Sequence, residues 1–185
     1  MRSVLISIKP KWCELIACGK KTIEVRKNKP KLEPPFKCYI YMTAGNAVYP
    51  VTINGMPYIC SNLGGKKVIG EFVCGAVLPI SITYSDPNVK IALREFPYTC
   101  LTDKEIMDYL GNGATGYGWC ISDLVIYDKP KELGEFFAYC ERCDKKPIAC
   151  KFAYEENNEN GYYSECMCDF KRPIERPPQS WCYVY

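Results

Sequence analysis

Four polar side chains near the start of the chain have the types and spacing that a binding pocket requires. Lys21, Thr22, Glu24 and Arg26 lie within six residues. Alternate side chains of a strand point to the same face, so Thr22, Glu24 and Arg26 share one face and Lys21 lies at the strand's mouth. Together they can bind a small polar ligand or a nucleotide. The alternative is an ordinary ion pair on a solvated surface, which contributes little stability.

A short helix and a glycine stop must position these side chains. Pro10 suits the first helical turn, where its missing N–H would have no partner anyway. Trp12 and Ile16 fall at helical spacing and can bury one side. Gly19 is placed as a C-cap, because glycine adopts the left-handed conformation without a Cβ clash. The sequence therefore predicts a helix that begins near Pro10, a turn, and a strand over residues 22–26.

The segment Gly19-x-Lys21-x-x-Glu24-x-Arg26 resembles the G-x-K-x-x-E-x-R signature of the ASCH family, a branch of the PUA-like barrels. The flanking residues 6–10 and the later stretch 119–124 are also similar to that family. The resemblance implies an α+β fold, a PUA-like (ASCH) mixed β-barrel with a few short helices. It also implies that the motif lies in a cleft that accepts a nucleobase or an RNA segment.

The resemblance further implies an RNA-binding or nucleotide-binding module, with a modified nucleotide as one possible ligand. Arg26 would contact phosphate, and Glu24 would accept a hydrogen bond from a base amino group. Tyr117 or Trp119 would supply a stacking surface, and the alternative for both is packing in the core. The expected ligand-binding residues are Lys9, Trp12, Lys20, Lys21, Thr22, Glu24, Arg26, Tyr117 and Trp119.

An enzyme is the second hypothesis, because one bacterial branch of the family resembles a 4-acetylcytidine amidohydrolase. That branch uses a lysine, a threonine and a glutamate; Lys21 matches the lysine, but Glu24 stands where the threonine is needed. Thr22 lies roughly 7 Å away along a strand, too far for a simple substitution. Lys21 beside Glu24 would also stay protonated and act poorly as a base. An enzyme of this kind would use Lys21, Glu24 and Glu71 as its catalytic residues. Because the required threonine is missing, the sequence favours a binding module over an enzyme.

Composition narrows the function classes further. The chain has no histidine, which excludes Ser-His-Asp and Cys-His catalysis and any histidine metal ligand. Residues 1–40 hold ten Lys or Arg and three Asp or Glu, a net charge of +7 in a chain of net charge +3. This basic segment suits an anionic partner, namely RNA, DNA or a nucleotide; the alternative is that the lysines only keep the protein soluble. No organic cofactor is expected.

Without an apolar run of membrane-spanning length or a signal peptide, we expect a soluble cytoplasmic protein with no membrane partner. Its 185 residues fit one domain with an insertion. Thr102 and Glu105 form a predicted capping box for a helix that Gly111 ends, Gly70 and Gly75 suggest bulges or barrel bends, and a short helix is expected over residues 130–139. A hairpin is expected at residues 54–55, and strands over 4–8, 37–42, 68–80, 117–127 and 180–185.

Three parts are predicted: an ASCH/PUA-like barrel over residues 1–139, a Cys-rich β-hairpin insertion over 140–170, and a strand over 171–185 that closes the barrel. The thirteen cysteines are an odd number and no secretion signal precedes them, so we expect reduced thiols or metal ligands. The five cysteines of the insertion are Cys140, Cys143, Cys150, Cys166 and Cys168.

These five cysteines predict a structural zinc site. Cys140-x-x-Cys143 is one half of such a site. Cys166 and Cys168 lie two apart, which on a regular strand separates their sulfurs by ~7 Å, whereas one zinc needs about 3.8 Å. Both can bind only if the strand bends, or else Cys150 or Cys182 takes one place. Buried free thiols are the alternative, and a zinc-stapled protein-interaction module is the third functional hypothesis.

Overall fold

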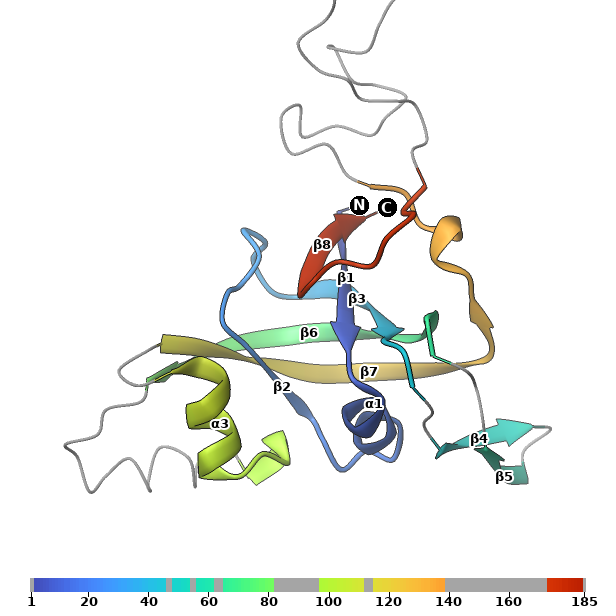
Figure 1. The fold of residues 1–185 in the computed structure, drawn as a ribbon, viewed down its shortest axis with the longest axis horizontal. Coiled ribbons are helices and arrows are strands. Elements are labelled where there is room, and N and C mark those ends of the chain that lie inside the picture. Colours follow the sequence, from blue (N-terminus) through green and yellow to red (C-terminus); the bar gives the residue numbers. More distant parts are fainter. Residues whose placement is uncertain are drawn as a thin grey trace, which may run out of the picture.

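The computed structural model describes residues 2–45, 48–53, 56–61, 65–81, 97–111, 115–138 and 173–184. Within these ranges the protein is α+β, with a six-stranded mixed sheet, a separate two-stranded sheet and the helices α1 and α3 (Figure 1). The α+β class expected from the sequence is therefore confirmed.

The main sheet has the strand order β2-β7-β6-β3-β1-β8. β1 and β3 pair in parallel, and the other neighbours pair antiparallel. Its strands are β1 (Ser3–Ile8), β2 (Ile23–Arg26), β3 (Phe36–Met42), β6 (Lys67–Ser81), β7 (Thr115–Lys131) and β8 (Trp181–Val184). Each observed strand matches a strand predicted from the sequence, and their ends differ by a few residues at most.

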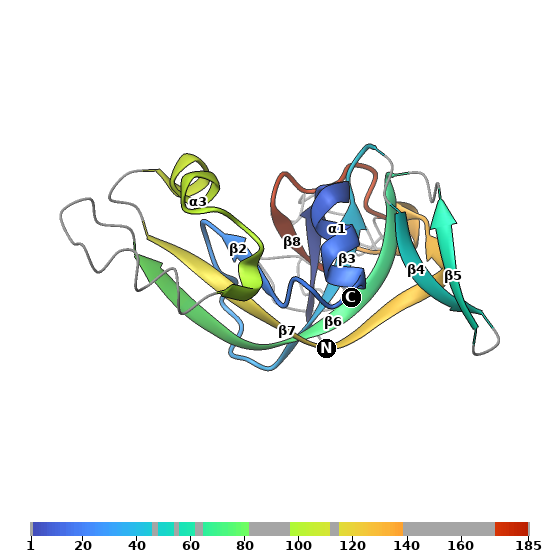
Figure 2. The same ribbon diagram turned by 90° about the horizontal axis from the view of Figure 1, so that it is seen from below.

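The prediction of a closed barrel is wrong. β2 and β8 are the two edge strands of the described sheet, and β8 pairs with β1 but not with β2. The long strands β6 and β7 nevertheless curve beneath β2, β1 and α1 (Figure 2). A side chain crosses the open seam, because Arg26 of β2 donates a hydrogen bond to the carbonyl of Ser7 on β1. A side-chain contact thus stands where barrel closure would need backbone pairing.

Bulges produce the curvature of β6 and β7. The register of the pair shifts between Val68 and Gly70 and again between Cys74 and Val77, the interval that contains Gly75. A Cβ at Gly70 would collide with the carbonyl oxygen of Val125 on the facing strand. Glycine is therefore required where the two backbones approach, and the bulges expected at both glycines are confirmed.

The second sheet is the hairpin β4 (Val48–Ile53) and β5 (Met56–Ser61). Ile53 pairs with Met56, so the hairpin that Asn-Gly predicts is present, while residues 54–55 themselves lie outside the described residues.

Two capped helices lie against the main sheet. α1 (Pro10–Ala17) is followed by Gly19 at φ +69°, the left-handed conformation expected of it. α3 (Asp103–Leu110) opens with the predicted capping box and ends at Gly111, whose φ is +96°. The helix expected over residues 130–139 is only a 3-10 turn over Leu133–Glu135, because β7 extends to Lys131.

Three apolar clusters hold these elements together. The largest packs one face of the sheet against α1, and Ile6, Ile16 and Trp119 belong to it. A second lies around Leu5 and Val184. The third consists of Val25, Ile80, Ile106 and Leu110, and it fixes α3 to the end of the sheet where β2, β6 and β7 meet.

The predicted Cys-rich hairpin and its five cysteines lie outside the described residues. Cys13, Cys18, Cys38, Cys74, Cys100 and Cys120 are free thiols, and no three or more Cys, Asp or Glu side chains of the described part are grouped so that they could hold a metal ion. Among the described helices, none is both long and apolar enough to span a membrane.

Candidate functional site

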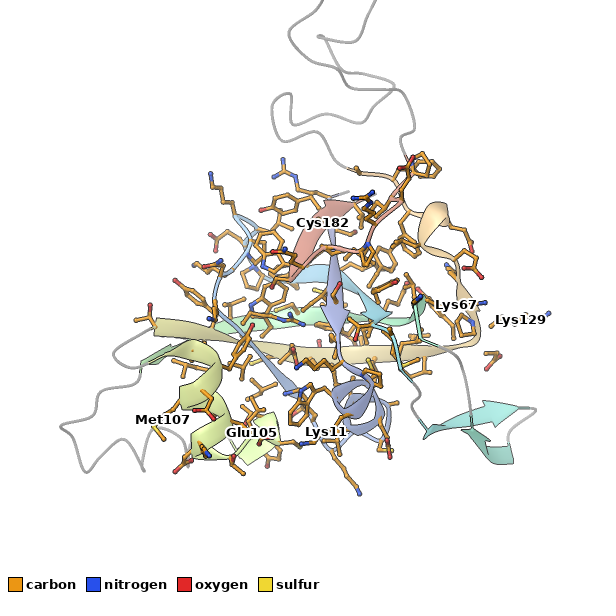
Figure 3. All side chains as sticks on the ribbon, viewed as in Figure 1. Lys11, Lys67, Glu105, Met107, Lys129 and Cys182 are labelled. Carbon is orange, nitrogen blue, oxygen red and sulfur yellow. The ribbon has the colours of Figure 1, made fainter. Side chains whose placement is uncertain are left out.

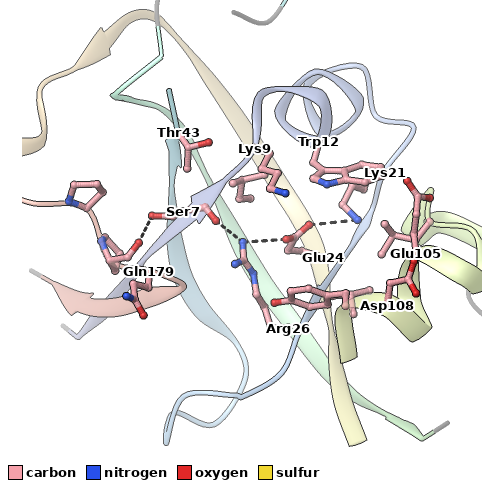
Figure 4. A pocket seen from close by; sticks show the side chains of 16 residues that line it. Ser7, Lys9, Trp12, Lys21, Glu24, Arg26, Thr43, Glu105, Asp108 and Gln179 are labelled. Carbon is pink, nitrogen blue, oxygen red and sulfur yellow. Dashed lines mark hydrogen bonds and ion pairs between the residues drawn. The ribbon is translucent and has the colours of Figure 1, made fainter. Parts of the chain in front are cut away.

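A cleft of about 750 Å³ opens at the seam of the sheet (Figure 4). Its walls come from the end of β1 with α1, from β2, from α3 and from the segment that precedes β8. Its polar and aromatic lining side chains are Ser7, Lys9, Trp12, Lys21, Glu24, Arg26, Thr43, Glu105, Asp108, Tyr109 and Gln179.

A chain of three charged side chains forms the inner part of the cleft. One oxygen of the Glu24 carboxylate, Oε2, lies 3.3 Å from the Nζ of Lys21. The other, Oε1, lies 3.0 Å from the Nη2 of Arg26. All three residues are at most 6% exposed. Buried ions persist only when they are paired and hydrogen-bonded, so the interpretation as a solvated surface pair is wrong. The trio carries a fixed formal charge of one positive unit.

The Lys21 ammonium has three oxygen partners. It donates to the carbonyl oxygens of Ile23 at 2.9 Å and Thr99 at 2.6 Å, and its third contact is the Glu24 carboxylate. The ammonium also lies 5.2 Å from the ring centroid of Trp12. Two hydrogen bonds and one ion pair therefore hold the ammonium, which can only donate, in one position.

Arg26 fixes β2 across the seam. Its Nη2 donates to the carbonyl of Ser7 at 2.6 Å and contacts Glu24, while its Nη1 makes a long contact of 3.5 Å with the Ser180 hydroxyl. The Ser7 hydroxyl in turn donates to the carbonyl of Pro178. The guanidinium therefore links β2, β1 and the segment before β8 around one wall of the cleft.

α3 supplies the opposite wall through Glu105, Asp108 and Tyr109, which lie on one face at spacings of three and four. Lys11 of α1 pairs with Glu105 at 3.2 Å across the mouth. The backbone N–H of Thr102 and then the Lys11 ammonium hold the pKa of Glu105 below its usual value. Glu105 is therefore an anion near neutral pH.

Comparison with known proteins identifies this arrangement. Residues 6–78 match the sequence model of the ASCH domain. Over that range, which is less than half of the chain, the sequence is similar to an ASCH domain. The matched range includes β1, α1 and β2 with Lys21, Glu24 and Arg26, while α3 lies outside it.

Solved structures agree on the fold. The crystal structure of ASCH from Zymomonas mobilis has a TM-score of 0.55 and 17% identity, over 99% of this chain and 87% of that chain. Tyrosine-to-phenylalanine and serine-to-alanine mutants of the same protein give the same score and identity, over 90% and 88% of their chains. At this identity the likeness extends to the fold alone. No curated protein matches.

Five of the expected ligand-binding residues line the cleft: Lys9, Trp12, Lys21, Glu24 and Arg26. Lys20 is exposed and does not line the cleft. Thr22 does not line it either, and its backbone N–H donates to the carbonyl of Tyr98.

The two aromatic side chains expected to stack on a base lie outside the cleft. Trp119 is fully buried in the core, where its ring meets that of Phe36 edge-on at 5.7 Å. Tyr117 is half-buried, and the Lys29 ammonium lies 5.9 Å from its ring centroid. Trp119 therefore follows the alternative of packing in the core, whereas Tyr117 packs against the core cluster with part of its side chain still exposed.

Glu71 lies away from the cleft and is held by other partners. Lys37 donates to one carboxylate oxygen at 2.8 Å and Tyr127 donates to the other. Partial burial raises the pKa of Glu71, but the two hydrogen bonds together with the charges of Lys37 and Lys131 leave that pKa lowered. Glu71 therefore does not share a site with Lys21 and Glu24.

The cleft residues that the sequence analysis missed come from three places. Those of α3 carried a usable signal, because polar side chains at spacings of three and four follow a capping box. Ser7 lies near the end of β1 and Thr43 directly follows β3, and the sequence of both strands is typical of ordinary core strands. Pro177, Pro178 and Gln179 read as a linker, and only the tertiary structure brings them to Ser7.

Proposed function

We propose that the ASCH domain binds a nucleotide unit, free or within an RNA, whose base and sugar enter the cleft lined by Lys21, Glu24 and Arg26. The observation that carries this proposal is the cleft itself, about 750 Å³ in volume with a fixed Lys–Glu–Arg chain at its inner end. Ligand sites are typically preformed hollows of several hundred Å³ with a few fixed polar groups that orient the ligand.

The charges of the cleft favour an uncharged moiety at its inner end. Three basic and three acidic side chains line it, so their formal charges cancel: Lys9, Lys21, Arg26, Glu24, Glu105 and Asp108. Carboxylates accept hydrogen bonds from base amino groups and ribose hydroxyls. Arg26 already serves Glu24 and Ser7. We therefore assign the phosphate to the exposed Lys9 rather than to Arg26.

The hydrogen bonds of Lys21 support binding rather than amide hydrolysis. A general base or nucleophile needs a lone pair, which a lysine gains by losing a proton. Lys21 donates to two carbonyl oxygens and pairs with the Glu24 carboxylate, and the Glu71 carboxylate lies elsewhere. Release of acetate from 4-acetylcytidine by the unmodified protein would nevertheless reverse this assignment.

Calorimetric titration tests the proposal with the four common nucleosides, their 5′-monophosphates and 4-acetylcytidine. Lys9→Gln should weaken binding of the monophosphates more than binding of the nucleosides, because it removes the phosphate contact. Asp108→Asn should weaken both. The matched control is Lys129→Gln, at an exposed lysine on the far part of β7 from α1 and α3 (Figure 3).

Two results would contradict the proposal. One is the lack of a measurable heat with every nucleoside and nucleotide at millimolar concentration. The other is equal loss of affinity in Lys9→Gln and Lys129→Gln. Arg26 variants are unsuitable for this test, since loss of the buried guanidinium would disturb the seam itself.

A further inference from the structure

We propose that the cleft continues into a surface track for single-stranded nucleic acid, formed by Tyr109, Lys27, Lys29 and Tyr117. This inference rests on the proposed function, because the track begins at the cleft. The first nucleotide would occupy the cleft, and its neighbours along the strand would follow the track.

Alternating tyrosines and lysines connect the cleft to the surface beside β2. Tyr109 lines the cleft, is 37% exposed and has the Lys27 ammonium 5.5 Å from its ring centroid. Tyr117 is half-buried and has the Lys29 ammonium 5.9 Å from its ring centroid. Tyr117 is also the β-sheet partner of Arg26, the residue before Lys27. The two lysine–tyrosine pairs are therefore neighbours on one side of the cleft.

The lysines of this segment carry uncompensated charge. Residues 27–31 include three exposed lysines and no acidic residue. In the described part, Lys27, Lys29 and Lys31 form no ion pair. Three lysines elsewhere each face a carboxylate, in the pairs Lys11–Glu105, Lys37–Glu71 and Lys67–Glu132. Positive charge that no carboxylate offsets, next to two partly exposed rings, complements a strand of phosphates and unpaired bases.

This chemistry selects single strands over duplexes. Bases stack on aromatic rings only when they are unpaired, and lysines beside the rings contact the phosphates between them. A duplex would offer the lysines its phosphates but would keep its base faces covered. RNA and DNA share the bases and phosphates, so the track accepts the shared chemistry of both.

Fluorescence anisotropy with labelled RNA and DNA strands of about ten nucleotides, a usual site size for single-strand binders, tests the lysines. The track variant is Lys27→Gln with Lys29→Gln, and the control is Lys66→Gln with Lys129→Gln, two exposed lysines away from the cleft. For a single strand, each lysine–phosphate pair contributes ~0.7 to the slope of affinity against salt, so the track variant should lower that slope by about 1.4. Mononucleotide affinity should be the same in both variants.

Tyr117 tests the stacking. Tyr117→Phe keeps the ring and should keep the oligonucleotide affinity. Tyr117→Leu keeps apolar volume against the core but removes the stacking surface, and it should lower the affinity roughly 5- to 100-fold, as removal of one base–aromatic stack does. Equal melting temperatures of the two variants show that both are folded.

The outcomes separate this inference from the proposed function. Failure of every nucleoside and mononucleotide to bind the unmodified protein tells against the cleft. Equal oligonucleotide affinity and salt slope in the track variant and its control overturn the track alone, as does equal affinity for a duplex and a single strand. Weaker binding of either RNA or DNA by the track variant, with mononucleotide binding intact, supports the track.

Discussion

Lys21 is the most deeply buried charged side chain of the described part, at 1% exposure. Withdrawing an ammonium from water is costly unless good partners replace the water. Two carbonyl oxygens and the Glu24 carboxylate do so here. Lys21 therefore connects the start of β2, the 3-10 turn that ends at Thr99, and the Glu24 carboxylate.

Replacing Lys21 with methionine tests this role. Lys21→Met should lower the free energy of unfolding by about 3–5 kcal/mol, because it removes one of the two cations beside the buried Glu24 and leaves two carbonyl oxygens without their donor. Urea unfolding followed by circular dichroism measures the change. The control is Lys11→Met, at a lysine whose side chain is 66% exposed, which should leave the stability nearly unchanged. Similar losses in both variants would contradict the burial argument.

Glu71 predicts a pH dependence of stability. Its pKa in the folded protein lies below the ordinary value of 4.5, so the unfolded chain binds more protons in that region and stability rises with pH there. The contribution is present above about pH 4.5 and is lost as the pH falls through the folded pKa. Urea unfolding of the unmodified protein and Glu71→Gln should show a difference that shrinks below pH 4.5. A difference that is constant from pH 7 to pH 3 would exclude this linkage.

At the scale of elements, α3 is a wall held by a small apolar cluster and one ion pair. Ile106 and Leu110 pack with Val25 and Ile80 on one side. The exposed Lys11–Glu105 pair joins α3 to α1 across the mouth of the cleft, as Figure 3 shows for the two labelled side chains. Because α3 lies outside the matched ASCH range, this wall is where specificity within the fold can differ.

The N-terminus of α3 gives a prediction for this wall. The Thr102 hydroxyl accepts a hydrogen bond from the backbone N–H of Glu105. The Glu105 carboxylate in turn accepts a hydrogen bond from the backbone N–H of Thr102. Thr102→Ala should reduce stability by about 1 kcal/mol, as loss of an N-cap usually does. Thr102→Ser keeps the hydroxyl and should stay near the unmodified protein in thermal unfolding. If serine and alanine destabilise equally, the cap is not the cause.

At the scale of the whole molecule, the open seam makes the cleft. In a closed barrel, backbone hydrogen bonds would join β2 to the opposite edge, and the space over Glu24 and Arg26 would be lost. Here Arg26 reaches the Ser7 carbonyl instead. Side chains and not backbone pairing join the two sides of the seam, so space for a ligand remains between the strands.

The Cys-rich segment supports a separate prediction, drawn from the sequence alone. Cys140, Cys143 and two of Cys150, Cys166 and Cys168 should bind about one zinc per chain, because four thiolates are a usual structural zinc set. Elemental analysis of protein purified without a chelator measures the metal. A chelator should then make the segment sensitive to protease while the ASCH domain stays folded. Protein without zinc, with the segment still protease-resistant, would leave these cysteines as thiols.

The sequence by itself determined the features that depend on a few neighbouring residues. Gly19 ends α1, Thr102 and Glu105 open α3, the Asn-Gly pair predicts the hairpin of β4 and β5, and Gly70 marks a bulge. Each is specified by the φ angle, the hydrogen bond or the steric demand of the residues concerned. The G-x-K-x-x-E-x-R resemblance also led to the ASCH domain and to the right strand.

Only the tertiary structure decided which side chains meet. Lys21 finds its acceptor on Thr99, 78 positions away, and Arg26 contacts Ser180, 154 positions away. The sequence was compatible with Trp119 either as a stacking surface or in the core, and the packing places it in the core. Glu71 accepts hydrogen bonds from Lys37 and Tyr127 and does not reach the cleft. Burial and partnership arise from segments distant in sequence, so no local pattern could distinguish a solvated strand face from a buried, charged cleft.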